Sequence, residues 1–184
     1  MALTESTMLA LGTPAPAFEL PDTISPARLT FDDVSGENGT LVYFICNHCP
    51  YVIYVIEELV EVAMAYEERG IGTVAISSND VANYPLDSPE NMEAFALKHL
   101  FTFPYLYDED QAVARAYDAA CTPDLYLFDA AGKLYYRGRL DPNRPGSGKA
   151  PDGSDLRAAL DAMLAGEPAP AKQYPSAGCN IKWK

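Results

Sequence analysis

A short apolar segment leads directly into two cysteines and a proline, and this junction limits the possible folds more than any other part of the chain. Residues 41–45 read Leu-Val-Tyr-Phe-Ile, and Cys-Asn-His-Cys-Pro follows at positions 46–50. The apolar segment is uncharged and rich in β-branched and aromatic residues, which predicts a buried strand. Proline suits the first helical turn, where a backbone N–H would have no partner. We therefore expect a strand over 41–45 and a helix that begins at Pro50, with Cys49 at its N-cap.

This helix start predicts chemistry at the cysteines. Unpaired backbone N–H groups and the positive end of the helix dipole meet at a helix N-terminus, and their field favours thiolate, the reactive form of cysteine. His48 is a possible second cation, because no Lys or Arg lies between Arg28 and Arg69. The field weakens beyond the first turn, so we expect Cys49 to be the nucleophile of a redox pair with Cys46, and Cys46 is the alternative nucleophile. A disulfide between them requires Cα atoms about 4.4–6.8 Å apart.

Length and charge exclude several classes of function. The chain has 184 residues, 48% of them hydrophobic, and a net charge of −13. We expect a single domain over 1–184 that needs no disulfide to fold. This strongly negative charge argues against nucleic-acid and anionic-membrane partners, because both need a basic face. Residues 1–12 lack the pattern of a signal peptide, so we expect a cytoplasmic protein, in which four cysteines indicate redox or metal chemistry rather than structural disulfides.

Strand and helix patterns alternate along the rest of the chain. The expected elements are a helix over 50–70, a strand over 71–76, a helix over 89–100, a strand over 103–107, a helix over 108–119, an antiparallel hairpin of strands 124–128 and 134–139, and a helix that Ser154 caps and Gly166 ends. This order indicates an α/β protein with a central mixed sheet and helices on both faces. The core is expected over about 10–166, with an N-terminal extension before it and a proline-rich tail over 167–184 after it.

The order of these parts resembles the thioredoxin fold. Besides the Cys-x-x-Cys helix start, the chain carries Cys-Thr-Pro at positions 121–123, directly before the expected hairpin. The segment 12–20, Gly-Thr-Pro-Ala-Pro-Ala-Phe-Glu-Leu, resembles the entry segment of the redoxin branch of that fold, the AhpC/TSA or peroxiredoxin-like proteins. The motif Phe-x-Cys-Asn-His-Cys-Pro-Tyr-Val and the closing Gly-Cys-Asn-Ile-Lys-Trp-Lys resemble a group of redoxin-domain proteins within this branch.

The resemblance implies an oxidoreductase that acts by thiol–disulfide exchange. Its substrates would be thiols or disulfides, with an electron donor that the sequence does not identify and with no cofactor. In such folds the matching Thr-Pro bond is cis and lies against the thiols, which exposes the backbone of Thr122 to a bound substrate. The residues implied for the site are the catalytic Cys46 and Cys49, supported by Asn47, His48, Pro50, Thr122 and Pro123.

A thiol-dependent peroxidase with an antioxidant role is an alternative. Typical thioredoxins have Trp before the first cysteine and Gly-Pro between the two, which this chain lacks. Typical peroxiredoxins read P-x-x-x-T-x-x-C, whereas Val42 and Cys46 occupy the proline and threonine places here. The Cys49-Pro50 step is nevertheless peroxiredoxin-like, which would make Cys49 the peroxidatic cysteine. Such an enzyme needs a nearby cation, and the candidates are Arg137, Arg139 and Arg144.

Two further cysteines and a metal site complete the alternatives. Cys121 and Cys179 are each either a resolving or auxiliary thiol or a small buried side chain. A metal-binding module would use Cys46, His48 and Cys49 as ligands, with Cys121 as a possible fourth. The sequence does not predict the oligomeric state.

Overall fold

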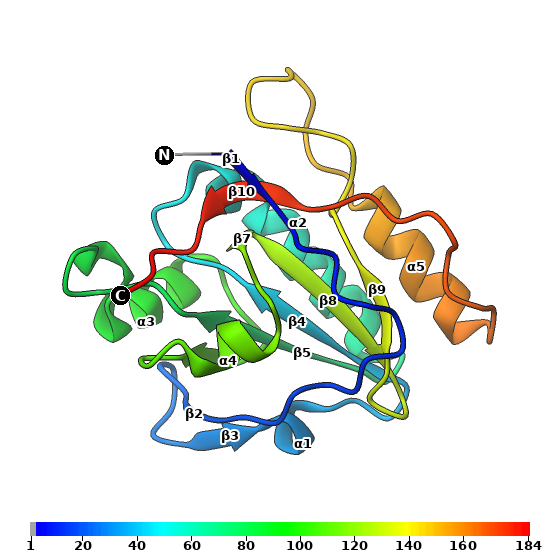
Figure 1. Cartoon of the computed structure of the whole chain (residues 1–184), viewed down its shortest axis with the longest axis horizontal. Helices are drawn as coiled ribbons and strands as arrows, with labels where there is room; N and C mark the ends of the chain where they lie inside the picture. Colours follow the sequence, from blue (N-terminus) through cyan, green and yellow to red (C-terminus); the bar gives the residue numbers. More distant parts are fainter. Residues whose placement is uncertain (1–2) are drawn as a thin grey trace.

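A five-stranded mixed sheet forms the centre of the computed structural model, which describes residues 3–184 (Figure 1). The strands lie in the order β6-β5-β4-β8-β9. Parallel pairing joins β4 to β5 and β5 to β6, whereas β8 is antiparallel to β4 and to β9. The five strands are β4 (Gly39–Phe44), β5 (Ile71–Ser77), β6 (Tyr105–Tyr107), β8 (Asp124–Asp129) and β9 (Leu134–Arg137).

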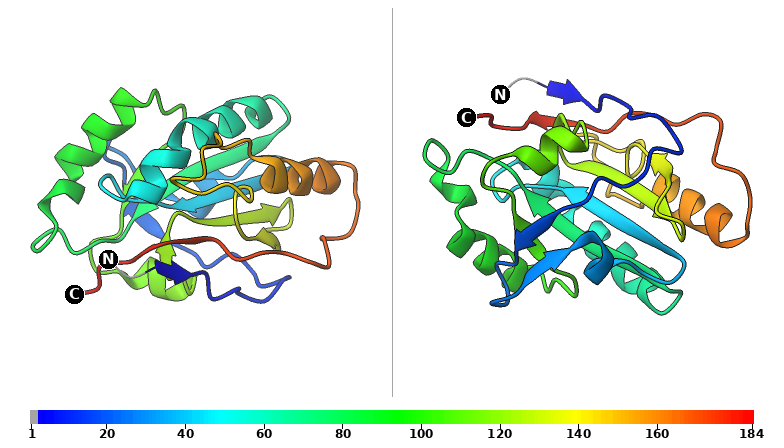
Figure 2. Two further views of the ribbon diagram at one scale, coloured as in Figure 1. Left: turned by 90° about the horizontal axis from the view of Figure 1, so that it is seen from above. Right: turned by 60° about the horizontal axis from the view of Figure 1, so that its bottom comes forward.

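Helices cover both faces of this sheet, which confirms the expected α/β class (Figure 2). One face packs against α2 (Pro50–Glu67), α3 (Pro89–Lys98) and α5 (Ser154–Leu164), and the other against α1 (Phe31–Val34) and α4 (Ala112–Ala116). Every residue of β4 is buried, because successive side chains of a strand point to opposite faces and both faces are covered.

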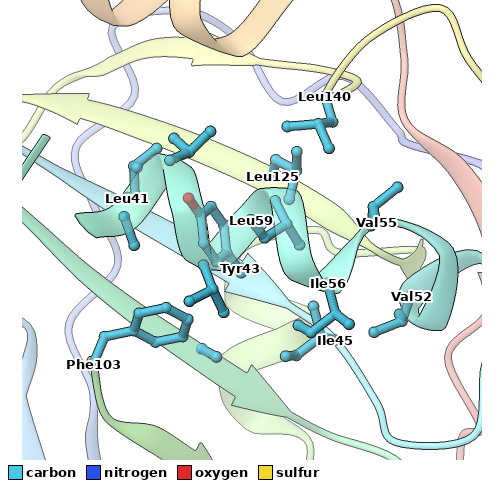
Figure 3. Packing of buried hydrophobic residues seen from close by; sticks show 14 of the residues in the cluster. Leu41, Tyr43, Ile45, Val52, Val55, Ile56, Leu59, Phe103, Leu125 and Leu140 are labelled. Atoms are coloured by element: carbon cyan, nitrogen blue, oxygen red, sulfur yellow. The ribbon is translucent and has the colours of Figure 1, made fainter. Parts of the chain in front are cut away.

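The larger core lies between α2 and the sheet (Figure 3). Val52, Ile56 and Leu59 recur at helical spacing and pack against Leu41 and Tyr43 of β4. This packing fixes the direction of α2 relative to β4. It thereby places the first turn of α2 directly after the carboxyl end of the central strand.

Two predicted helices start differently from expectation. The helix expected over 108–119 is shorter and consists of α4 alone. The Asp108 carboxylate accepts hydrogen bonds from the backbone N–H groups of Val113 and Ala114 at 3.2 and 2.9 Å, which keeps the residues before α4 in a turn. The last helix begins at Ser154 itself, since Gly153 is the N-cap, with a left-handed φ of 64°. Ser154 is therefore the first helical residue and not the cap.

Several short elements were not predicted from the sequence. They are α1, β1 (Leu3–Glu5), β2 (Glu19–Pro21), the 3₁₀ helix η1 (Pro85–Asp87), β7 (Cys121–Thr122) and β10 (Ala177–Asn180). A small second sheet has the order β1-β10-β7, so the tail runs back across the molecule beside the N-terminal strand (Figure 1). A hairpin of β2 with β3 (Arg28–Thr30) lies on the α1 side. Within residues 3–184, no helix has the length and apolar character that crossing a bilayer requires.

Candidate active site

Cys49 occupies the N-cap of α2, with Pro50 in the first helical turn, as the sequence predicts. The strand β4 ends at Phe44, so Cys46 lies in the short turn between strand and helix. Neither cysteine is part of a disulfide, and both residues are buried. The junction therefore brings the two thiols to one place beneath the surface.

The Thr122–Pro123 peptide bond is cis, and Thr122 touches both thiols. The Thr122 hydroxyl lies 3.4 Å from the sulfur of Cys46, and the Thr122 carbonyl oxygen accepts a hydrogen bond from the Cys49 thiol at 3.3 Å. The expectation that the Thr122 backbone is open to a substrate needs correction. Strand β10 pairs with β7 in the register Cys179 to Thr122, so the chain's own tail covers that backbone.

Cys179 is the third sulfur of the site. The pairing of β10 with β7 places its Sγ atom 2.8 Å from the Sγ atom of Cys49. Cys121 also lies on β7 but is directed elsewhere, since its thiol donates to the carbonyl oxygen of Pro123 at 3.5 Å. Of the two auxiliary candidates, the structure therefore brings Cys179 into contact with the helix N-terminus and leaves Cys121 outside that contact.

The surroundings of the three sulfurs favour ionisation of Cys49. Hydrogen bonds from Cys46, from Cys179 and from the backbone N–H of Val52 lower the pKa of Cys49 to about 5, against the opposing effect of burial. The hydrogen bond to Cys49, burial and the charge of Asp87 raise the pKa of Cys46 well above its ordinary value. Burial and the hydrogen bond with Cys49 raise the pKa of Cys179 to about 12. When Cys49 ionises, its thiolate accepts from the two neutral thiols and no longer donates to the Thr122 carbonyl oxygen.

Asp87 is a buried acid of the site that sequence reasoning missed. Its Oδ1 accepts the backbone N–H of Asn47 at 2.8 Å, and its Oδ2 accepts the Asn79 amide at 2.8 Å and lies 2.8 Å from Nδ1 of His48. The sequence shows Asp87 only as one polar residue of a loop, so no pattern could have singled it out. Asn47 and His48 are thus held against η1.

His48 also stacks on Tyr84, with ring centroids 5.9 Å apart and planes 6° apart. The structure therefore places His48 between Asp87 and an aromatic ring. The groups that lower the pKa of Cys49 come instead from the two thiols and the start of α2.

The three donors that lie together differ from the predicted metal set. The ligand atoms of Cys46, His48 and Asp87 lie within 4.8 Å of one another. Cys49, which the prediction included, contacts Cys179 instead. A structural zinc site is almost always tetrahedral with four protein ligands, and this group provides three.

The three arginines considered for a peroxidase are engaged elsewhere. Arg137 donates to the backbone carbonyl of Met8 at 2.7 Å, and Arg139 to Asp155 at 2.6 Å. Arg144 donates to backbone carbonyl oxygens of its own loop. None of these contacts directs a guanidinium toward Cys49.

A model of the AhpC/TSA family matches residues 11–137. The chain belongs to the AhpC/TSA family. This AhpC/TSA protein is 30% identical to the thiol-disulfide oxidoreductase ResA of Geobacillus thermodenitrificans over 134 residues, which cover 71% of this chain and 70% of that protein. The match confirms the family that the sequence motifs suggested.

Solved structures extend the likeness of this AhpC/TSA protein to its whole length. A conserved protein of Geobacillus kaustophilus has 52% identity and a TM-score of 0.98, with 100% of this chain and 97% of that chain covered. A hypothetical protein of Sinorhizobium meliloti 1021 has 44% identity and a TM-score of 0.95, with 98% of each chain covered. A putative thioredoxin of Neisseria meningitidis, at 22% identity, a TM-score of 0.63 and coverage of 82% and 89%, shares the fold. The expected thioredoxin-like fold is confirmed.

Proposed function

We propose that the protein is a thiol–disulfide oxidoreductase in which Cys49 attacks and Cys46 resolves. The observation that carries this proposal is the placement of Cys49 at the start of α2, where hydrogen bonds lower its pKa to about 5. A thiolate at physiological pH is the form that attacks a disulfide. The name of the relative from Geobacillus thermodenitrificans, a thiol-disulfide oxidoreductase, supports the same reaction class.

The reaction proceeds in two exchanges. The Cys49 thiolate attacks one sulfur of a substrate disulfide, forms a mixed disulfide and expels the other sulfur as a thiolate, which takes up a proton. Cys46 then loses its proton and attacks the Cys49 sulfur, so the second substrate thiolate leaves. Two electrons pass from the pair to the substrate, and an external dithiol must return them. Because the pKa of Cys46 is raised, Cys46 stays a thiol until the mixed disulfide removes the charge of Cys49.

Disulfide reduction with dithiothreitol as the electron donor tests this function. We expect Cys49→Ser to lose turnover of a disulfide-bonded peptide, because serine is no nucleophile toward sulfur. Cys121→Ser is the matched control, since this buried thiol contacts Pro123 and should leave turnover unchanged. Full turnover in the Cys46→Ser/Cys49→Ser double variant would show that the reaction does not depend on this pair and would overturn the proposal. The cytoplasmic location stays a prediction.

A further inference from the structure

The tail strand β10 lies directly over the attacking thiol. Cys49 has 0% of its surface exposed, and Cys46 and Cys179 are buried beside it. Cys179 pairs with Thr122 on one side and with Leu3 of β1 on the other. An external disulfide can therefore reach Cys49 only after part of this cover moves, and β10 carries Cys179, the sulfur already in contact with Cys49.

A glycine makes this close approach possible. A Cβ atom on Gly178 would lie 2.0 Å from the carbonyl oxygen of Thr122 and 3.3 Å from Cδ of Pro123. Any other residue at this position would force β10 away from β7, since real Cβ atoms do not approach oxygen so closely. Gly178 thus allows the next residue, Cys179, to bring its sulfur within 2.8 Å of Cys49.

The residues after Cys179 hold the tail in one position. The backbone N–H of Ile181 donates to Ala120 at 3.1 Å, and that of Lys182 to the side chain of Asn79 at 2.8 Å. The Lys182 carbonyl accepts from the Gln111 amide and from the backbone of Asp80, each at 2.8 Å. These hydrogen bonds fix the tail against the rest of the protein, and the tertiary structure thereby holds the Cys179 sulfur beside that of Cys49.

We propose that Cys179 is a third redox-active residue, which competes with Cys46 to form a disulfide with Cys49. The inference rests on the proposed exchange reaction. After Cys49 has formed a mixed disulfide with a substrate thiol, Cys179 loses its proton and attacks the Cys49 sulfur. A Cys49–Cys179 bond forms, the bond from Cys49 to the substrate sulfur breaks, and the substrate leaves as a thiolate that takes up a proton. With β10 in the position that the structure shows, the two sulfurs must approach from 2.8 Å to about 2.04 Å to form this bond.

Removal of Cys46 isolates this reaction. The Cys46→Ala variant is treated with glutathione disulfide, and the reaction is then quenched with an alkylating reagent. We expect an intramolecular Cys49–Cys179 disulfide, which mass spectrometry of the digested protein would detect. Cys46→Ala/Cys179→Ala should stop at a mixed disulfide of Cys49 with glutathione. Cys46→Ala/Cys121→Ala is the matched control and should behave like Cys46→Ala.

The outcomes separate this proposal from the proposed function. If Cys46→Ala accumulates the glutathione adduct as fully as the variant that also lacks Cys179, the role of Cys179 is overturned while attack by Cys49 stands. If Cys49 forms neither an adduct nor a disulfide in any variant, both are overturned.

A second variant tests the approach of β10 without removing a thiol. Gly178→Ala in the Cys46→Ala background, with folding checked by circular dichroism, should slow Cys49–Cys179 closure by at least about tenfold, since displacing reacting atoms by about 1 Å has effects of this size. Formation of the glutathione adduct should not slow. Ala177→Gly, which adds no atom to the same strand, is the control. Equal closure rates in a folded Gly178→Ala protein would contradict the proposal.

Discussion

The buried Oδ2 atom of Asp87 lies 2.8 Å from Nδ1 of His48. The same carboxylate accepts the backbone N–H of Asn47 at 2.8 Å, so one acid from η1 fixes two residues of the Cys46–Cys49 turn. Its charge also faces Cys46 and contributes to the raised pKa of that thiol. Asp87 therefore acts on the redox pair as a positioning residue and as a source of negative charge.

Asp87→Asn is expected to lower the pKa of Cys46, because it removes a negative charge that disfavours the thiolate. The measurement is the pH dependence of alkylation at the Cys46 peptide, read by mass spectrometry, in which the transition of Cys46, later than that of Cys49, should move to lower pH. Asp32→Asn, at an exposed position in the first turn of α1, is the charge-matched control and should leave the curve unchanged. A later transition at the same pH in both variants would show that Asp87 does not act on Cys46.

Cys49 should titrate near pH 5 and should link stability to pH. Its pKa is lowered from 9.0 to about 5 in the folded protein, so the folded state releases its proton earlier than the unfolded state. The resulting stabilisation is present in full above about pH 9 and is lost as the pH falls to 5. Denaturant unfolding between these pH values should show a smaller pH dependence in Cys49→Ser. Identical slopes would contradict a lowered pKa.

Asp124 should have the opposite effect on stability. Burial raises its pKa from 3.8 to about 6, so the folded protein favours the protonated acid. Its contribution to stability is present in full below about pH 3.8 and is lost as the pH rises through 6. We expect Asp124→Asn to increase the free energy of unfolding at pH 7 by about 1–3 kcal/mol relative to the wild type. This gain in the free energy of unfolding should vanish near pH 4. A gain that stays the same at all pH values would show that ionisation of Asp124 is not its cause.

Two isoleucines on α2 provide a matched test of the core. Ile56 is 1% exposed and packs against the sheet, whereas Ile53 is 53% exposed on the same helix. Ile56→Val should lower the free energy of unfolding by about 0.5–1.5 kcal/mol, because it removes a buried methylene group. Ile53→Val should change it by less than about 0.5 kcal/mol. Equal losses would mean that helix propensity and not packing sets the cost.

Peroxide should react slowly with Cys49. A peroxidase needs a cation beside its thiolate, and Arg137 and Arg139 are engaged with Met8 and Asp155. Dimedone capture of sulfenic acid at Cys49, followed by mass spectrometry, measures the rate in the Cys46→Ala/Cys179→Ala variant, where neither neighbouring thiol can consume the sulfenic acid first. The same variant with Cys49→Ser is the blank. Complete capture within seconds at micromolar peroxide would favour the peroxidase alternative over disulfide exchange.

The sequence predicted those parts of the fold that depend on nearby residues. The apolar segment before Cys46, the proline after Cys49 and the helical spacing of α2 are local signals, and the strand and helix lie where they indicate. Strand β10 carries no such signal, since its four residues Ala-Gly-Cys-Asn form a strand only through pairing with β1 and β7. Asp87 could not be assigned to the site for the same reason, because tertiary contacts bring it there, and the sequence named Cys179 as a candidate thiol without distinguishing it from Cys121.

Both edges of β10 are paired, one with β1 and one with β7. If β10 moves away from Cys49, the hydrogen bonds between β10 and β7 must therefore break. Strand β1 then either moves together with β10 or separates from β10. Strands β1 and β10, which lie far apart in the sequence, are in this way mechanically joined at the cover of the sulfur cluster. An affinity tag or fusion partner joined ahead of β1 is accordingly expected to alter how readily Cys49 meets its substrate, although it lies far from that cysteine in the sequence.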